Sequence, residues 1–256
     1  MSLIIKTNSY TGNILNNLYT VNNKLFKSME KLSSGLKINS ASDDPAGLVI
    51  SEQMRSRIAS LNQEIENTGN LINKYETASS TALELRSMLT EMRSLAVAAG
   101  NTGVNDSATQ QVYQDSLNSL AKTYNNIVNN ASFGTQKLFD GSEGSLTSIA
   151  QLGNINLADA QSAEEAINYL DDMAARLDNT VSELGATQKN ELEANLRNLR
   201  IESQNLTAAE SQIRDVDFGL EFSEFMKNKL LLNSAVALLA QGNMLSNTVL
   251  SLIGNR

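Results

Sequence analysis

Adjacent carboxylates are the side chains in this sequence best suited to acid-base chemistry or metal binding, and they occur as Asp43-Asp44, Glu164-Glu165 and Asp171-Asp172. The second and third pairs lie in stretches with helical periodicity, where sequence neighbours point in different directions and cannot face one substrate together. The first pair precedes Pro45, and a carboxylate at that place typically caps a helix start. We therefore interpret all three pairs as structural or solvated, and predict neither a catalytic nor a metal site.

Other common routes to catalysis are absent. The sequence has no His and no Cys, which removes the usual general base, the thiol nucleophile and most transition-metal ligand sets. It also lacks a phosphate-binding Gly-x-x-x-x-Gly-Lys stretch, and no Gly-x-Gly-x-x-Gly follows a strand. The net charge of -8 comes from scattered carboxylates, which argues against a nucleic-acid surface. We predict a non-enzymatic protein without cofactor.

Neither a membrane helix nor a cleaved secretion signal is predicted. The most apolar window, residues 230–239, is interrupted by Asn233 and Ser234, and it is shorter than the roughly 20 residues that a membrane-spanning helix needs. Residues 1–6 lack the charged start, long apolar stretch and small-residue cleavage site of a secretory signal. We expect no membrane insertion, and we expect any secretion to leave the N-terminus uncleaved by that route.

The composition favours long helices, since there is one Pro and many helix-compatible residues. Near the N-terminus, apolar residues recur at alternating spacings of four and three, as on the contact face of a coiled-coil helix. These positions are Ile14, Leu18, Val21, Leu25 and Leu32, with Ser28 at the remaining one. The C-terminal segment shows the same pattern at Phe218, Phe222, Phe225, Leu232, Val236, Leu239, Leu250 and Ile253, interrupted by Lys229, Asn243 and Ser246. The two ends are therefore predicted to pair with each other or with neighbours.

Two further helices are predicted in the first half of the chain. One begins at Pro45, capped by Asp44, and ends at Gly100. The next opens with the capping-box pattern of Ser107 and Gln110, and Gly134 stops it.

A third internal helix opens with a capping box of Ser162 and Glu165, and it runs towards Ile213. Its apolar pattern shifts by four residues after Gln188, which predicts local relaxation of the supercoil. Periodicity is lost in residues 134–160, where turn residues such as Gly144 predict a small β-hairpin region.

The predicted fold is mostly α, with long antiparallel helices in a coiled-coil-like bundle, a small β-hairpin region and paired terminal helices. A single-chain bundle with no role in assembly fits this pattern equally well.

Several stretches resemble bacterial flagellins. The longest is LSSGLKINSASDDPAGLVISEQMRSRI at residues 32–58. The others are LGATQ at 184–188, NLTAAESQIRDVDF at 205–218, LLAQGN at 238–243 and NTVLSL at 247–252. They occur in the family's order at both ends of the chain, so the sequence is identified as similar to a short flagellin that lacks a large variable outer domain.

The resemblance implies a subunit that assembles into the flagellar filament. Residues 1–42 and 215–256 would form an inner-tube coiled coil, and 43–214 an outer-tube bundle. The turn between them would be set by Ser40, Asp43, Asp44 and Pro45. Implied partners are other flagellin subunits, an export chaperone at the C-terminal segment, the flagellar type III export apparatus, and the hook-junction and filament-cap proteins. The implied location is the extracellular filament.

One stretch, LTEMRSLAV at residues 89–97, is similar to the segment that the innate-immune flagellin receptor recognises. Arg93 and Leu95 match that segment, but Glu91 stands where strongly recognised members carry a basic residue. The resemblance therefore implies weak recognition. Two alternative functions fit part of the sequence: a hook-filament junction protein, which shares the terminal helices, and a cytoplasmic signalling coiled coil.

Overall fold

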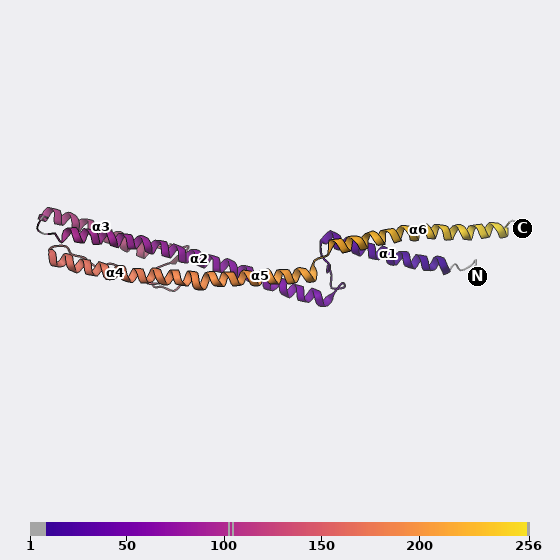
Figure 1. The fold of residues 1–256 in the computed structure, drawn as a ribbon, viewed down its shortest axis with the longest axis horizontal. Coiled ribbons are helices and arrows are strands. Elements are labelled where there is room, and N and C mark those ends of the chain that lie inside the picture. Colours follow the sequence, from indigo (N-terminus) through magenta and orange to yellow (C-terminus); the bar gives the residue numbers. More distant parts are fainter. Residues whose placement is uncertain (1–8, 102, 104, 255–256) are drawn as a thin grey trace. The chain divides into compact units, whose positions relative to one another are not determined.

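The computed structural model describes residues 9–254 apart from 102 and 104, and the side chains of 11–244 with the same two exceptions. The chain divides into two compact units, Met1–Ser60 with Ser203–Arg256, and Leu61–Glu202. Helix accounts for 80% of the structure, which confirms the predicted mostly α fold. The elements in Figure 1 are α1 (Ser9–Ser34), α2 (Pro45–Ala99), α3 (Ser107–Asn130), β1 (Ser132–Phe133), β2 (Gln136–Lys137), α4 (Ala160–Ala186), the π-helix η1 (Thr187–Leu192), α5 (Glu193–Arg214) and α6 (Phe218–Gly254).

In the first unit, α1 and α6 pack along one another in opposite directions (Figure 1). Lys31, near the end of α1, forms an ion pair of 3.7 Å with Glu221 at the beginning of α6. Gly242, far along α6, lies against Thr11 near the beginning of α1. This confirms the predicted pairing of the two terminal helices.

A short backbone pairing joins the two chain segments that leave these helices. Gly35, with a φ of 74°, ends α1, and its amide donates to Lys31 O at 2.9 Å. Its carbonyl accepts from Val216 N at 3.0 Å, and Lys37 N donates to Arg214 O at 2.6 Å. An antiparallel bridge between Leu36 and Asp215 results. The sequence pattern gave no sign of this pairing.

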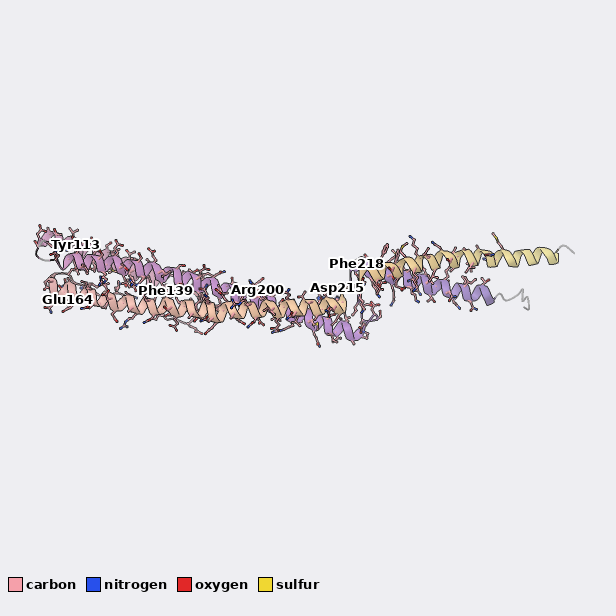
Figure 2. All side chains as sticks on the ribbon, in the orientation of Figure 1. Tyr113, Phe139, Glu164, Arg200, Asp215 and Phe218 are labelled. Atoms are coloured by element: carbon pink, nitrogen blue, oxygen red, sulfur yellow. The ribbon has the colours of Figure 1, made fainter. Side chains whose placement is uncertain are left out.

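The core of the second unit lies between α2, α3, α4 and the hairpin region. Its large, almost fully buried side chains come from all of these elements: Leu85, Leu89, Met92, Leu117, Tyr124, Leu138, Phe139, Leu157 and Leu170. Phe139 is labelled at its place beside α4 in Figure 2. The hairpin region and the irregular segment after it therefore complete the helical core and are not an appendage to it.

The hairpin is smaller than predicted and begins earlier. Ser132 pairs with Lys137 and Phe133 with Gln136, so the strands begin two residues before position 134. Gly134 does not stop α3, which ends at Asn130; its φ of 61° instead places it in the turn between the strands. The predicted turn residues Gly141 and Gly144 also have positive φ, at 72° and 94°. Asp140 and Ser148 form a further isolated bridge.

Both predicted capping boxes were assigned to the wrong residue. α3 is capped by Asp106, whose carboxylate accepts from Thr109 N at 2.7 Å, and not by Ser107. α4 is capped by Asp159, and Ser162 is its partner three residues later in the box, so Glu165 has no part in it. Asp caps at least as well as Ser, and in each case an Asp shortly before the Ser forms the cap.

Residues 150–158 run along α3 without strand partners and form what we call the strap. Asn125 both donates to Leu152 O at 2.9 Å and accepts from Leu152 N at 2.8 Å. Gln114 likewise donates to Ile155 O and accepts from Leu157 N, at 2.8 and 2.7 Å. Side-chain amides thus take the place of a neighbouring strand for this backbone.

The predicted shift after Gln188 coincides with the π-helix η1, which separates α4 from α5. A π-helix closes its hydrogen bonds over one more residue than an α-helix does. The irregular spacing in the sequence is therefore accommodated by a local widening of an otherwise continuous helical rod.

Candidate functional site

The predicted contact positions of α1 lie on its least exposed face. Ile14 and Ser28 are buried, and the four others are half-buried: Leu18, Val21, Leu25 and Leu32. This spacing is the expected one for a helix that packs against a single antiparallel partner.

On α6 the predicted contact positions lie on more than one face of the helix. Phe225, Leu232 and Leu239 are half-buried as expected, whereas Phe218, Phe222 and Val236 are 57%, 56% and 52% exposed. The face of α6 that is least exposed instead runs through Glu221, Phe225, Asn228, Leu232, Ala235, Leu239 and Gly242. Because α6 carries apolar residues on several faces, spacing alone selected residues from two of them. Leu250 and Ile253 lie outside the residues whose side chains are described.

The exposed large apolar side chains of these two helices form what we call the open apolar surface. On α1 they are Leu15, Tyr19, Phe26 and Met29. On α6 they are Phe218, Leu220, Phe222, Met226, Leu230, Leu231, Val236, Leu238 and Met244. Figure 2 labels Phe218 at the first turn of α6. Exposed apolar side chains in such number are typical of interaction surfaces.

The turn between α1 and α2 is held by Asp43. Its Oδ2 accepts from Ser40 N and Ser40 Oγ, both at 3.1 Å, and from Asn39 N at 3.3 Å, while Oδ1 pairs with Lys27 Nζ at 3.3 Å. Burial acts to raise the pKa of the Asp43 carboxyl, but the hydrogen bonds from Ser40, Lys27 and Asn39 together hold it below its ordinary value. Ser40 and Asp43, two of the predicted turn residues, are thus in direct contact.

Asp44 and Pro45 start α2 in the predicted manner. Asp44 Oδ1 accepts from Gly47 N at 2.9 Å, and Pro45 is the first helical residue. Gly47 is tightly enclosed, because a Cβ there would lie 2.5 Å from Asp44 Oδ2 and 2.8 Å from Ile38 Cδ1. Ile38 is itself 2% exposed. The turn therefore packs closely against the first turn of α2.

One ion-pair cluster ties α2 to α5 in the first unit. Arg214 Nη1 donates to Glu52 Oε1 at 2.7 Å, and Arg55 Nη1 donates to the same oxygen at 2.9 Å. Hydrogen bonds from Arg214 and then Arg55 lower the pKa of the Glu52 carboxyl. The contact from Arg214 was not predicted, because Arg214 and Glu52 are far apart in the sequence.

The two residues of the receptor-like segment are placed differently. Arg93 is bound to Asp171 of α4, and the hydrogen bond from Arg93 lowers the pKa of that carboxyl. Leu95 is partly buried and packs against the core. Recognition by an immune receptor stays a prediction.

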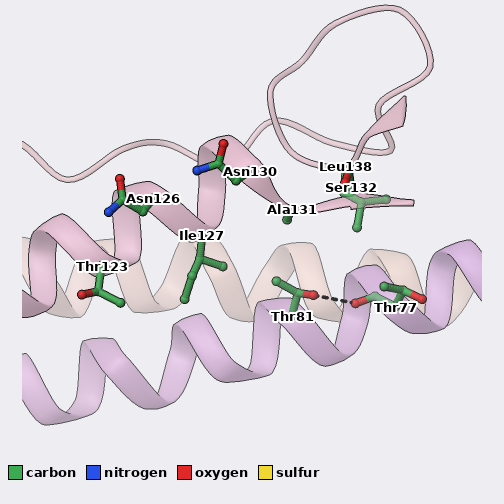
Figure 3. Close-up of a pocket in the computed structure, with 9 residues that line it drawn as sticks. All are labelled: Thr77, Thr81, Thr123, Asn126, Ile127, Asn130, Ala131, Ser132 and Leu138. Atoms are coloured by element: carbon green, nitrogen blue, oxygen red, sulfur yellow. Dashed lines mark hydrogen bonds between the residues drawn. The ribbon is translucent and has the colours of Figure 1, made fainter. Parts of the chain in front are cut away.

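A groove of the second unit lies between α2, α3 and the hairpin (Figure 3). It has a volume of about 390 Å³. Thr77, Thr81 and Thr123 line it, and each of their hydroxyls donates to the carbonyl four residues earlier. Its other lining residues are Asn126, Ile127, Asn130, Ala131, Ser132 and Leu138, so none of its side chains is acidic or basic.

Two further properties concern the described residues only. No helix among them has both the length and the apolar character needed to cross a membrane. No three acidic side chains among them gather closely enough to hold a metal ion.

Comparison with known proteins assigns the family. Residues 5–144 match the family model of the bacterial flagellin N-terminal helical region, and residues 167–253 match that of the C-terminal helical region. A flagellin of Bacillus subtilis (strain 168) is 37% identical, over 94% of this chain and 96% of that protein.

A flagellin of Halalkalibacterium halodurans is 36% identical, over 98% of this chain and 100% of the relative. The flagellar filament 33 kDa core protein of Treponema phagedenis is 32% identical, over 89% of this chain and 91% of the relative. These three relatives are named as flagellins or as a flagellar filament core protein, so they do not favour a hook-filament junction protein or a signalling coiled coil. With both helical regions matched and relatives aligned along nearly the whole chain, this protein belongs to the bacterial flagellin family and is a structural subunit of the flagellar filament.

Proposed function

We propose that the chain polymerises into the filament through the open apolar surface of α1 and α6. The observation that carries this proposal is the exposure of large apolar side chains on faces of α6 that α1 leaves uncovered, Phe222 and Val236 among them. Burial of apolar surface is favourable by about 25 cal/mol per Å². Helices of further copies can bury this surface. Contacts between different faces of successive copies build an open helical polymer.

Within this proposal the predicted contact positions of α1 and α6 have two roles. Inside one subunit, one face of α1 packs against one face of α6. The α1 residues are Ile14, Leu18, Val21, Leu25 and Leu32, and the α6 residues are Phe225, Leu232 and Leu239. Phe222 and Val236 contact neighbouring subunits, and Leu250 belongs to the same inner tube. Residues 1–42 and 215–256 then form the inner tube, residues 43–214 form the outer tube, and the turn of Ser40, Asp43, Asp44 and Pro45 sets the angle between them.

The open apolar surface also supports a proposal about further partners of the chain. An apolar surface of this kind would self-associate before export, so a chaperone that covers the C-terminal segment in the cytoplasm is physically reasonable. We infer delivery by the flagellar type III export apparatus, without a cleaved signal, to an extracellular filament bounded by hook-junction and cap proteins. We propose no reaction, cofactor or metal for the chain.

We also expect the terminal helices to become ordered as the filament forms. Because a lone α1–α6 pair leaves many apolar side chains in water, subunit contacts are needed to offset the entropy of ordering. Amide hydrogen exchange tests this. Rapid exchange in both terminal segments of the monomer and strong protection in the filament are expected, whereas protection already present in the monomer would refute it.

The polymerisation surface is tested by replacing Phe222 and Val236 together with Asn. Both side chains are more than half exposed, so the monomer should keep its helix content and its unfolding midpoint. Seeded growth on filament fragments, followed by electron microscopy, should be lost. Lys229→Asn, an exposed change on the same helix, is the matched control and should grow normally. Normal growth of the double variant would overturn the proposal.

A further inference from the structure

We propose that the open apolar surface is a site of methionine oxidation, at which peroxide converts exposed thioethers to sulfoxides and so stops the free subunit from joining a filament. The residues are Met29 on α1 and Met226 and Met244 on α6, which are 47%, 41% and 69% exposed. This inference rests on the proposed function, because the same surface is the one that polymerises. It adds to that function a reversible chemical modification that controls it.

The other methionines whose side chains are described are shielded from solvent. Met88, Met92 and Met173 belong to the core of the second unit, and each is at most 8% exposed. Met54 on α2 is half-buried. A dissolved oxidant must touch the sulfur to react with it, so exposure decides which methionines are modified first. Peroxide should therefore modify the open apolar surface while the core of the second unit stays intact.

Met226 and Met29 lie among other exposed apolar side chains of their helices. Residues three or four positions apart are neighbours on a helix surface. Met226 is one turn from both Phe222 and Leu230, which are 56% and 64% exposed. Met29 is one turn from Phe26, which is 60% exposed. A polar group introduced at either methionine is therefore placed within the open apolar surface, where a neighbouring subunit would have to bury it.

The reaction needs only a peroxide as co-reactant. The thioether sulfur attacks one oxygen of hydrogen peroxide, an S–O bond forms, and the O–O bond breaks. The sulfur loses two electrons and the peroxide gains them, and the released hydroxide takes the proton of the new S–OH group and leaves as water. The product is a polar sulfoxide, and burying its oxygen without a hydrogen-bond partner is unfavourable.

Assembly would protect the site that oxidation inactivates. In a filament the open apolar surface is covered by neighbouring subunits, so peroxide reaches these methionines mainly before a subunit is added. Sulfoxide reductases with a thiol reductant convert the product back to methionine. The oxidised subunit is therefore withheld from the polymer and not destroyed.

The first test treats the full-length monomer with hydrogen peroxide and maps sulfoxides by mass spectrometry of its peptides. The three exposed methionines should be oxidised well before the three core methionines, with the helix content unchanged. The subunit concentration needed for seeded growth should then rise roughly tenfold or more, because each sulfoxide removes the gain from burying a methionine side chain. Oxidation of the three exposed methionines with no effect on growth would overturn the proposal.

The matched variant combines Met29→Leu, Met226→Leu and Met244→Leu, which keep the surface apolar but cannot be oxidised. It should grow on filament fragments equally well before and after peroxide. Growth that peroxide stops in this variant as in the parent chain would refute the oxidation site and leave the polymerisation surface untouched. The polymerisation surface has its own test in the Phe222 and Val236 double variant, so the two failures are distinct.

A repair experiment needs no variant. Oxidised parent monomer is incubated with two sulfoxide reductases, one for each sulfoxide epimer, and a thiol reductant. Seeded growth should recover together with loss of the sulfoxide mass at the three exposed methionines. Complete reduction of these sulfoxides without recovery of growth would show that peroxide acts elsewhere in the chain, and would reject the proposal.

Discussion

The Arg93 guanidinium donates to both carboxylate oxygens of Asp171, with Nε to Oδ1 at 2.6 Å and Nη2 to Oδ2 at 3.2 Å. Seven residues earlier on α2 and seven later on α4, Arg86 Nε donates to Asp178 Oδ1 at 2.9 Å. The equal and opposite offsets show that α2 and α4 run antiparallel in a constant register between the two pairs. Exposed ion pairs contribute little to stability, so their main effect is on this register.

Acid is expected to destabilise the monomer through these carboxylates. Arg93 lowers the folded-state pKa of Asp171, and Arg214 with Arg55 lowers that of Glu52. A carboxyl whose pKa is lower in the folded state contributes stability above its unfolded pKa, and this contribution is lost as pH falls through the folded pKa. The midpoint temperature of thermal unfolding should therefore decrease as the pH is lowered from about 5 to about 2. The decline should be shallower in Asp171→Asn, and an equal decline in that variant would contradict the assignment.

Loss of the Asp44 cap should affect filament form more than monomer folding. Asp44→Ala leaves the Gly47 amide without its acceptor and should cost about 1 kcal/mol, measurable by equilibrium unfolding. Filaments grown from this variant should differ in helical shape under electron microscopy. Asp44→Asn keeps a capping oxygen and serves as control. Unchanged filament geometry together with a collapsed monomer is the result that would count against this view.

Gly47→Ala should destabilise the chain, because its methyl group would overlap Asp44 Oδ2 and Ile38 Cδ1. Overpacking of this kind costs roughly 1–3 kcal/mol. Gly69 lies on the same helix with no atom within 4 Å of an added Cβ, so Gly69→Ala should stabilise by roughly 0.5–1 kcal/mol. Urea unfolding of the two variants should therefore shift in opposite directions, and a shared direction would show that the enclosure of Gly47 is unimportant.

The strap should loosen when either amide clamp is removed. Gln114→Ala or Asn125→Ala leaves part-buried backbone groups of Leu152, Ile155 or Leu157 unpaired, which costs roughly 1–3 kcal/mol. Hydrogen exchange at the Leu152 and Leu157 amides should accelerate. Gln111→Ala, which removes an exposed contact to Asp115 on the same helix, is the control. Exchange rates that match the control would mean that apolar burial alone holds the strap.

Local signals predicted the helices well. Asp44-Pro45 marked the start of α2, Gly100 marked its end, and the spacing from Ile14 to Leu32 identified the contact face of α1. Each of these depends on neighbouring residues or on regular apolar spacing along one helix. On α6 spacing alone cannot separate the face that packs on α1 from the others, because Phe222 and Val236 are as apolar as Phe225.

The features that the sequence did not reveal are non-local. The Asn125 and Gln114 clamps join residues 27 to 43 positions apart, and Glu52 with Arg214 spans 162. Asn and Gln at such positions look like ordinary exposed helix residues.

The π-helix between α4 and α5 acts as an angular correction. Leu199 follows Leu184 by fifteen residues, and in an unbroken α-helix of 3.6 residues per turn their directions would differ by about 60°. Both side chains are nevertheless buried, at 8% and 4% exposed. A wider turn uses more residues per revolution, so Thr187–Leu192 delays the rotation and restores the phase of the apolar face. One continuous rod thereby keeps both Leu184 and Leu199 on its buried side across this change in spacing.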